Sequence, residues 1–331
     1  MTTSSSHSTQ DNSGPRQDAR ALTIPVIVGP TASGKSSLAI AVAEALDGEI
    51  VNCDSVQVYQ RIEIATAKVP PAERHGILHH LIDFVPPEVN FTAGDWARVA
   101  GETIREIEAR GKTAVLAGGT GLYLRSLRQP LFASPATDGE LRRRLTAIRE
   151  TKGAIHLHRI LARMDPAEAE KLNPRDWPRV QRALEVYLQT GKRVSVQRPE
   201  RPAPPELAAR LRIFVLNPPR HELYDRINQR TEQHFANGLV GEVQNLLDEG
   251  VPPESNALGA HGYRRVVEFL RGQRDLASAI EETKLNVRHY AKRQLTWFRH
   301  EPGVEWIEGF GDDPGVQKRV IEILGEQCAN G

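Results

Sequence analysis

The sequence has little of several things that define common protein classes. Of its 331 residues only two are cysteines, Cys53 and Cys328, too few for a disulfide framework or a four-ligand zinc site. No window approaches the roughly 18 uninterrupted apolar residues that a transmembrane helix needs, so no membrane partner is expected. The first 20 residues also lack the apolar run of a secretory signal. The scarcity of cysteine favours a protein from a reducing compartment.

What is present indicates an α/β protein of about two domains. Apolar residues make up 39% of the chain and charged residues 26%, values typical of a globular protein with a sizeable core. Apolar runs separated by helical stretches predict a parallel sheet with crossover helices, whose ligands gather at the carboxyl ends of the strands. We expect strands at residues 23–28, 49–52, 81–85, 113–117 and 213–216. We expect helices at residues 36–46, 92–110, about 220–249 and 274–299, the last two joined through the Gly-rich segment 259–263.

The middle of the chain has a different composition. Residues 125–205 are rich in Arg, Ala and Leu at helical spacing and end in a Pro-rich stretch. The first 20 residues are mostly polar and have little to bury, which predicts a disordered tail at 1–20. The sequence therefore predicts a phosphate-loop core formed by 21–124 and 206–331, with an inserted, mainly helical domain at 125–205.

A phosphate-binding loop follows the first predicted strand. The sequence matches G-x-x-x-x-G-K-[ST] at every defined position and leads into a predicted helix. Backbone N–H groups of such a loop face one anion, the helix N-terminus adds partial positive charge, Lys35 adds a full charge, and the Ser36 hydroxyl can bind Mg²⁺. The loop predicts binding of a polyphosphate but does not say which one. Two functions therefore stay open as alternatives: a small-molecule kinase, and an RNA-binding protein with a degenerate loop. The expected diphosphate- or nucleotide-binding residues are Gly29, Pro30, Thr31, Ala32, Ser33, Gly34, Lys35 and Ser36.

Motifs further along the chain make the loop more specific. Residues 54–59 read DSVQVY, residues 118–123 read GGTGLY, residues 182–187 read RALEVY, and residues 290–299 read YAKRQLTWFR. In this order, with the loop, they resemble the tRNA dimethylallyltransferase (tRNA isopentenyltransferase) family over about residues 24–307. The chain departs from the family pattern at Ala65, His261, Arg265 and Val287, which leaves the reaction class unchanged.

The resemblance implies transfer of a dimethylallyl group from dimethylallyl diphosphate to N6 of the adenosine beside the anticodon of tRNA, releasing diphosphate. The loop, Lys35 and Mg²⁺ would stabilise the negative charge on the leaving group. Asp54 is expected to take the N6 proton as the new bond forms; the alternative is that it caps a turn or orders Mg²⁺ through water. Without the cysteines of the zinc finger common in eukaryotic relatives, the chain resembles a bacterial-type cytoplasmic enzyme, expected to be a monomer.

Three further side chains are candidates near the reacting groups. Arg226 and Arg230 lie four residues apart and share a face of the predicted helix. Either this is a solvated charged face or one of the two, with Arg226 as our candidate, reaches the diphosphate. Thr120 is expected to contact the adenosine or neighbouring phosphates. The glycines around it form either part of that contact or only a tight turn.

The substrate base has to leave its stack before N6 can react. By resemblance, the flipped base and its neighbours would be contacted by the motif after the second strand and by the segment at 178–182. Arg142, in a run of three arginines, would contact the tRNA; an exposed helix face is the alternative. The expected tRNA-binding residues are Asp54, Ser55, Val56, Gln57, Thr120, Arg142, Pro178, Arg179, Val180, Gln181 and Arg182.

The distribution of charge agrees with an RNA partner. The formal net charge is only +1. Residues 141–230, however, contain 20 Lys and Arg against 10 Asp and Glu, a local charge of +10, while the rest of the chain carries −9. A basic segment of this kind neutralises RNA phosphates, so we expect the tRNA on the inserted unit and the helix after it.

Overall fold

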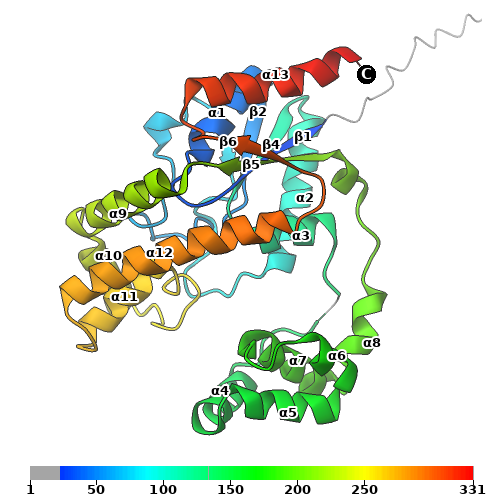
Figure 1. Cartoon of the computed structure of the whole chain (residues 1–331), viewed down its shortest axis with the longest axis vertical. Helices are drawn as coiled ribbons and strands as arrows, with labels where there is room; N and C mark the ends of the chain where they lie inside the picture. Colours follow the sequence, from blue (N-terminus) through cyan, green and yellow to red (C-terminus); the bar gives the residue numbers. More distant parts are fainter. Residues whose placement is uncertain (1–22, 133, 331) are drawn as a thin grey trace, which may run out of the picture.

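The computed structural model describes residues 23–132 and 134–330, and the tail expected at 1–20 lies outside them. The expected α/β class is confirmed: a six-stranded, all-parallel sheet has the order β3-β2-β4-β1-β5-β6 (Figure 1). The strands are β1 (Ile24–Val28), β2 (Gly48–Asn52), β3 (His79–His80), β4 (Thr113–Gly118), β5 (Leu211–Asn217) and β6 (Val304–Glu308). Because β1 lies between β4 and β5, the loops after these three strands meet at the carboxyl edge of the sheet.

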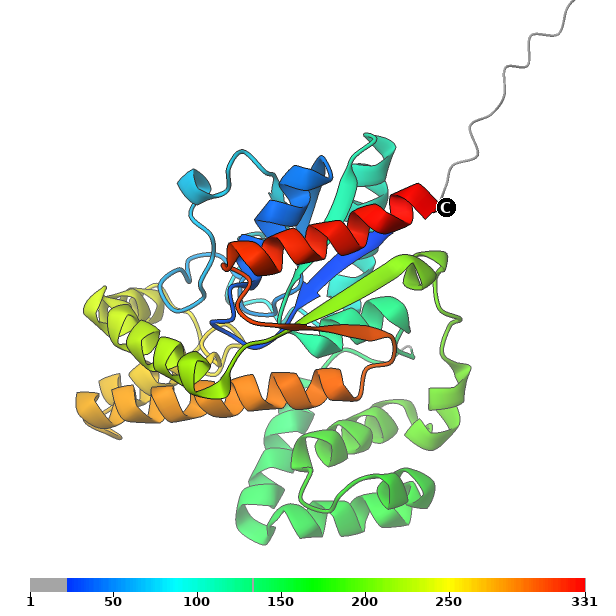
Figure 2. The ribbon, with the colours of Figure 1, turned by 45° about the horizontal axis from the view of Figure 1, so that its top comes forward.

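Helices cover both faces of the sheet (Figures 1 and 2). One face packs against α1 (Lys35–Ala45) and α13 (Pro314–Asn330). The other packs against α2, α3, α10, α11 and α12. Their bounds, with that of α9, are α2 (Ala93–Ala109), α3 (Gly121–Arg128), α9 (Arg220–Ala236), α10 (Leu239–Asp248), α11 (His261–Leu270) and α12 (Leu276–Arg299). All residues of β1 and β2 are buried, as expected for strands with helices on both faces.

A separate group of helices lies below the sheet in Figure 1. It consists of α4 (Gly139–Lys152), α5 (Ala154–Met164), α6 (Pro166–Lys171), α7 (Trp177–Thr190) and α8 (Val194–Gln197). This helical unit has its own core, which includes the fully buried Leu157, Leu161, Val180 and Leu184. A core of its own supports treating the unit as an inserted domain. Short 3₁₀ turns follow at Arg198–Glu200 and Glu206–Arg210, and another lies at Pro71–Glu73.

The structure differs from the sequence-based expectations in several places. Residues 125–128, expected in the insertion, belong to α3, whose Leu124 and Leu127 lie in the core on the sheet. The strand expected at 81–85 is wrong: Leu81 and Asp83 have φ of 60° and 54°, which an extended strand does not allow. The helix expected at 220–249 breaks into α9 and α10 at Gly238, whose φ is 96°. The strand β6 and the helices α11 and α13 were not expected.

Candidate active site

Two adjoining cavities lie at the carboxyl edge of the sheet. The first, about 370 Å³, is lined by the phosphate loop and the start of α1, and we call it the loop cavity. The second, about 640 Å³, opens between the ends of β2 and β4 and the helices α9, α11 and α12, and we call it the wide cavity. Both are lined by Thr31, Ala32, Asp54, Thr66, Ala67, Arg230 and Tyr290. The shared lining makes them neighbouring halves of one site.

The phosphate loop shapes the loop cavity. Its turn needs left-handed backbone at Ala32 and Gly34, whose φ values are 63° and 81°. The Lys35 ammonium donates to the carbonyl of Pro30 at 2.7 Å, and burial lowers its pKa to about 8. The Ser33 hydroxyl is buried and has no hydrogen-bond partner among the described residues. A cation and an unused hydroxyl on a loop rich in N–H groups make this wall suited to an anion.

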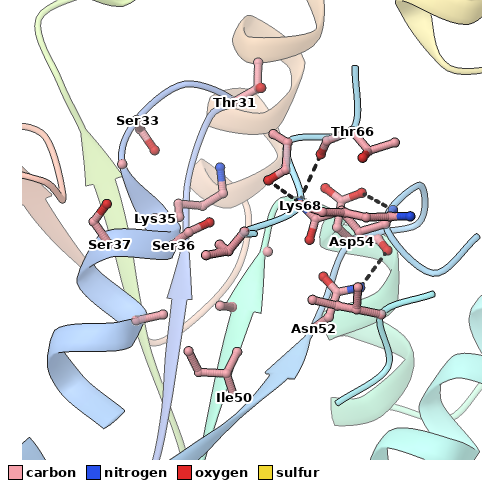
Figure 3. Close-up of a pocket in the computed structure, with 18 of the residues that line it drawn as sticks. Thr31, Ser33, Lys35, Ser36, Ser37, Ile50, Asn52, Asp54, Thr66 and Lys68 are labelled. Carbon is pink, nitrogen blue, oxygen red and sulfur yellow. Dashed lines mark hydrogen bonds between the residues drawn. The ribbon is translucent and has the colours of Figure 1, made fainter. Parts of the chain in front are cut away.

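Asp54 faces the loop cavity from the end of β2. Figure 3 shows it near Lys35, which enters from the start of α1. One carboxylate oxygen, Oδ1, accepts the N–H of Val56 at 2.9 Å and that of Gln57 at 3.4 Å. No partner within the described ranges binds the other oxygen, Oδ2. The carboxylate therefore caps a turn with one oxygen and keeps the second free, so the two roles considered for Asp54 are compatible.

Thr120 holds the segment after Asp54. Its hydroxyl accepts the Ser55 N–H at 2.9 Å and donates to the Ser55 hydroxyl at 3.2 Å. The glycines on either side of it are required by packing. A Cβ on Gly118 would lie 2.1 Å from the carbonyl oxygen of Cys53, and one on Gly121 would lie 2.2 Å from the Trp297 ring. Close packing thus accounts for Gly118 and Gly121, while Thr120 itself lines the wide cavity.

Gln294 of α12 is a site residue that the sequence did not single out. Its side-chain oxygen accepts the N–H of Thr31 at 2.8 Å, and its side-chain nitrogen donates to the carbonyl of Gly119 at 2.9 Å. It is 5% exposed and lines the loop cavity. A buried glutamine with both ends used fixes the phosphate loop against the turn after β4. The signal was present, because Gln294 lies in the YAKRQ motif.

Arg230, and not Arg226, reaches the cavities. The Arg230 guanidinium lines both cavities and has no hydrogen-bond or ion-pair partner within the described ranges. Its burial lowers its pKa, and its charge helps to lower that of Lys35. Arg226, our candidate for the diphosphate ligand, instead pairs with Asp312 and lines neither cavity. An unpaired cation beside Lys35 is a second positive group for an anion.

Two further residues on the α-helical wall were not expected from the sequence. Tyr290 lines both cavities, and burial raises its pKa, so its hydroxyl is neutral. His261, one of the departures from the family pattern, packs against Tyr290 with ring centroids 5.0 Å apart and lines the wide cavity. Burial lowers the pKa of His261 to about 4, so it adds a neutral polar ring to that wall.

Comparisons with known proteins agree on one family. The family model described as IPP transferase matches residues 57–301. A tRNA dimethylallyltransferase of Solibacter usitatus is 47% identical over 313 residues, which is 91% of this chain and 98% of that protein. The chain belongs to the tRNA dimethylallyltransferase family. Another member, from Geobacter sulfurreducens, is 47% identical over 300 residues, covering 91% of this chain and 96% of the relative.

Solved structures of the family have the same fold. The full-length tRNA isopentenylpyrophosphate transferase of Bacillus halodurans superposes with a TM-score of 0.66 at 36% identity, covering 93% of this chain and 96% of that chain. A eukaryotic dimethylallyltransferase acting on tRNA superposes with a TM-score of 0.74 at 28% identity, covering 94% and 80% of the two chains. Both are similar across the sheet and the helical unit, because their coverage includes nearly the whole chain.

Several residues that the family resemblance assigned to tRNA binding have internal roles. Val180 is 0% exposed and Gln181 4% exposed, so their side chains pack inside the helical unit, and a direct contact of either residue with RNA stays a prediction. Arg142, whose side chain is 46% exposed, makes two hydrogen bonds of 2.8 Å to the fully buried carboxylate of Glu185. Arg182 donates to the carbonyl of Pro135 at 2.7 Å. These side chains hold the unit together.

Other residues of the same segment are open to solvent. Pro178 and Arg179 are exposed at the start of α7, and Arg143 and Arg144 are exposed on α4. Trp177 is 39% exposed, with the Arg149 guanidinium 4.0 Å from its ring centre. Because the substrate of this family is tRNA, these exposed arginines and the aromatic ring are candidates for contacts with RNA. No helix in the described ranges is both long and apolar enough to span a membrane.

Proposed function

We propose that this family member transfers a dimethylallyl group from dimethylallyl diphosphate to N6 of the adenosine adjacent to the anticodon of tRNA. The observation that carries the proposal is the joined cavity, with unpaired Arg230 and Lys35 beside the phosphate loop and the free oxygen of Asp54 facing the same space. One half of the site suits a diphosphate, and the other has room for a flipped base. The family membership supplies the reaction class.

The positive groups act on the leaving diphosphate. When the allylic C–O bond breaks, both of its electrons stay on the diphosphate, and its charge rises. Lys35, Arg230 and the N–H groups of the loop stabilise that charge. The two hydrogen bonds of Gln294 fix the loop backbone before the diphosphate binds, so the N–H groups are already in position when its charge rises.

The acceptor side completes the reaction. The N6 lone pair of adenine forms the new C–N bond at the allylic carbon, and N6 then carries an extra proton. Asp54 Oδ2, which is free, accepts that proton, while Oδ1 stays bound to the N–H groups of Val56 and Gln57. Thr120 keeps Ser55, and with it the neighbouring Asp54, at the mouth shared by the two cavities.

Mg²⁺ is proposed as the cofactor. The described ranges hold no group of three or more His, Cys, Asp or Glu side chains that could by itself bind a metal. The Ser36 hydroxyl lines the loop cavity, and this oxygen donor fits a Mg²⁺ that takes its other ligands from phosphate and water. When bound there, Mg²⁺ would neutralise charge on the diphosphate. We also propose that the protein acts as a monomer.

The test is a direct assay. Purified protein, dimethylallyl diphosphate, Mg²⁺ and unmodified tRNA should yield N6-dimethylallyladenosine in a nuclease digest analysed by mass spectrometry. Removing Mg²⁺ with a chelator should stop the reaction, and adding it back should restore it. Asp54→Asn should lower kcat at least about 100-fold with tRNA affinity near normal. The matched control Asp248→Asn changes a carboxylate on α10 whose hydrogen-bond partner among the described residues is Gln244, and it should be fully active.

Two results would contradict the proposal. One is phosphoryl transfer from ATP to a small molecule with no product from the prenyl donor, which would make the protein a kinase. The other is tight tRNA binding by the parent protein with no turnover under any donor, which would make it an RNA-binding protein.

A further inference from the structure

The guanidinium of Arg226 and the carboxylate of Asp312 join α9 to the loop between β6 and α13. Nη1 of Arg226 donates to both oxygens of Asp312, at 2.9 Å to Oδ1 and 2.8 Å to Oδ2. The guanidinium also lies 3.7 Å from the centre of the Phe310 ring. Neither Arg226 nor Asp312 lines the loop cavity or the wide cavity. Arg226 is therefore occupied outside the space in which an anion would bind.

The loop that carries Asp312 packs directly against the phosphate loop. The N–H of Gly311 donates to the carbonyl of Ser33 at 2.8 Å. A Cβ placed on Gly34 would lie 2.7 Å from Oδ1 of Asp312 and 2.7 Å from its backbone nitrogen. Gly34 thus has to be glycine both for its φ of 81° and for this close approach. The Asp312 carboxylate lies against the backbone of the phosphate loop at Gly34, outside the loop cavity.

A negative charge in that place opposes anion binding unless it is cancelled. Two like charges less than about 10 Å apart still repel each other near a protein surface, although salt weakens the effect. Arg226 supplies the cancelling charge. The pair is about half exposed, with 43% and 44% of the two side chains open to solvent, so its influence should depend on ionic strength.

An apolar cluster beside the pair fixes the position of α9. Phe310 packs in a cluster with Leu223 and Ile227 of α9, and Ala32 of the phosphate loop packs against that cluster. Arg230 lies one helical turn beyond Arg226, above the cavities. Arg230 is therefore held at the cavities by apolar packing that does not depend on the ion pair.

We propose that Arg226 and Asp312 are positioning residues for the diphosphate, with Arg226 acting through Asp312 by cancelling its charge behind the phosphate loop. The inference rests on the proposed function, since it takes a diphosphate as the bound anion. This role and direct binding by Arg226 predict different results. If Arg226 acts through Asp312, removing the Asp312 charge should restore the pyrophosphate binding that is lost with the Arg226 charge.

The test measures pyrophosphate binding in the presence of Mg²⁺ by calorimetry on the full chain. Arg226→Gln should weaken binding about 3- to 10-fold at low salt and less at high salt. The double variant Arg226→Gln with Asp312→Asn, which has no charge at either position, should bind within about 2-fold of the parent. Arg226→Lys keeps the charge and should lie close to the parent, which guards against a purely structural defect. Arg98→Gln, which removes an exposed ion pair with Glu102, is the matched control.

Steady-state kinetics provide a second measurement. Arg226→Gln should raise KM for dimethylallyl diphosphate by the same factor, with kcat and tRNA affinity little changed. A double variant as weak as Arg226→Gln, at all salt concentrations, would overturn the inference and make Arg226 a direct ligand. Rescue of pyrophosphate binding in a protein that transfers no prenyl group would keep the role of the pair and reject the proposed function.

Discussion

The side chain of Gln294 connects Thr31 of the phosphate loop to the turn after β4. It accepts the Thr31 N–H at 2.8 Å and donates to the carbonyl of Gly119 at 2.9 Å, while itself buried. The parts of the loop cavity that bind an anion and the turn that carries Thr120 therefore share one support from α12. This support lies 263 residues along the chain from Thr31.

Replacing Gln294 with alanine should loosen both ends of that support. The buried carbonyl of Gly119 would lose its partner, at a cost of about 1–3 kcal/mol, and the partly buried N–H of Thr31 would lose its own at a smaller cost. We expect KM for dimethylallyl diphosphate to rise and kcat to fall about 10-fold, with the thermal midpoint lowered, in steady-state assays and calorimetry. Gln273→Ala, at an exposed glutamine, is the control. Unchanged kinetics in Gln294→Ala would show that the phosphate loop is fixed without it.

Alanine at the glycines of the turn should have graded effects. A Cβ on Gly119 would lie 2.1 Å from Nε2 of Gln294, the end of a flexible side chain, whereas one on Gly118 would lie 2.1 Å from the backbone of Cys53. Gly119→Ala should therefore fold and resemble Gln294→Ala kinetically, while Gly118→Ala should unfold at a much lower temperature. Gly241→Ala in α10 meets nothing within 4 Å and should be neutral or slightly stabilising. Equal melting temperatures for the first two would refute the packing argument.

The depressed pKa of Lys35 predicts a pH dependence. Burial holds this pKa at about 8, below the ordinary value of 10.5, so the free enzyme loses the Lys35 charge as pH rises through about 8. Because the charged form binds the anion, kcat/KM for dimethylallyl diphosphate should fall above pH 8. Binding at pH 8 should take up protons, since an anion favours the ammonium form. The proton uptake can be measured by calorimetry in buffers of different ionisation enthalpy.

A second variant isolates the group responsible. Arginine at position 35 keeps its charge throughout this pH range. The kcat/KM of Lys35→Arg should be lower than that of the parent but measurable, and it should not show the parent's decline between pH 8 and 10. A decline identical to that of the parent would assign the titration to another group.

Sequence patterns over a few consecutive residues predicted those parts of the molecule whose structure is set by residues close together in the chain. The β1 strand, the phosphate loop and α1 follow from a β-branched run, glycines and an alanine-rich segment. Arg226 and Arg230 could not be separated in this way, because they lie one turn apart on one helix face. Only the loop after β6, which brings Asp312 to Arg226 from 86 residues away, decides between them.

The tRNA-binding segment shows the opposite limit. The resemblance assigned all of residues 178–182 to RNA, although a helix presents successive residues to different sides. Val180, Ala183 and Leu184 have the spacing of a buried face, and they lie in the core of the helical unit. Side-chain direction, which the motif does not encode, leaves Pro178 and Arg179 as the open positions.

The arginine run on α4 should divide into structural and RNA-binding members. Arg142 binds the 0%-exposed carboxylate of Glu185, and its hydrogen bonds hold the pKa of that carboxyl below its usual range against the effect of burial. Arg142→Ala should therefore destabilise the protein by about 1–3 kcal/mol. The stabilisation is present above the unfolded pKa of Glu185 and is lost as pH falls through the folded one, so the difference from the parent should shrink in acid.

Arg143 and Arg144 should behave in the other way. The Arg143 side chain is 76% exposed, and Arg144 is also open to solvent, so replacing both with alanine should leave the melting temperature unchanged. Removing an arginine that binds an RNA phosphate should raise KM for tRNA and reduce the slope of log affinity against log salt by about 1. Filter-binding titrations at several salt concentrations, beside thermal melts of both variants, separate the two roles. A double variant that melts early but binds tRNA normally would reverse the assignment, and Arg142 would then be the residue of the run that meets the RNA.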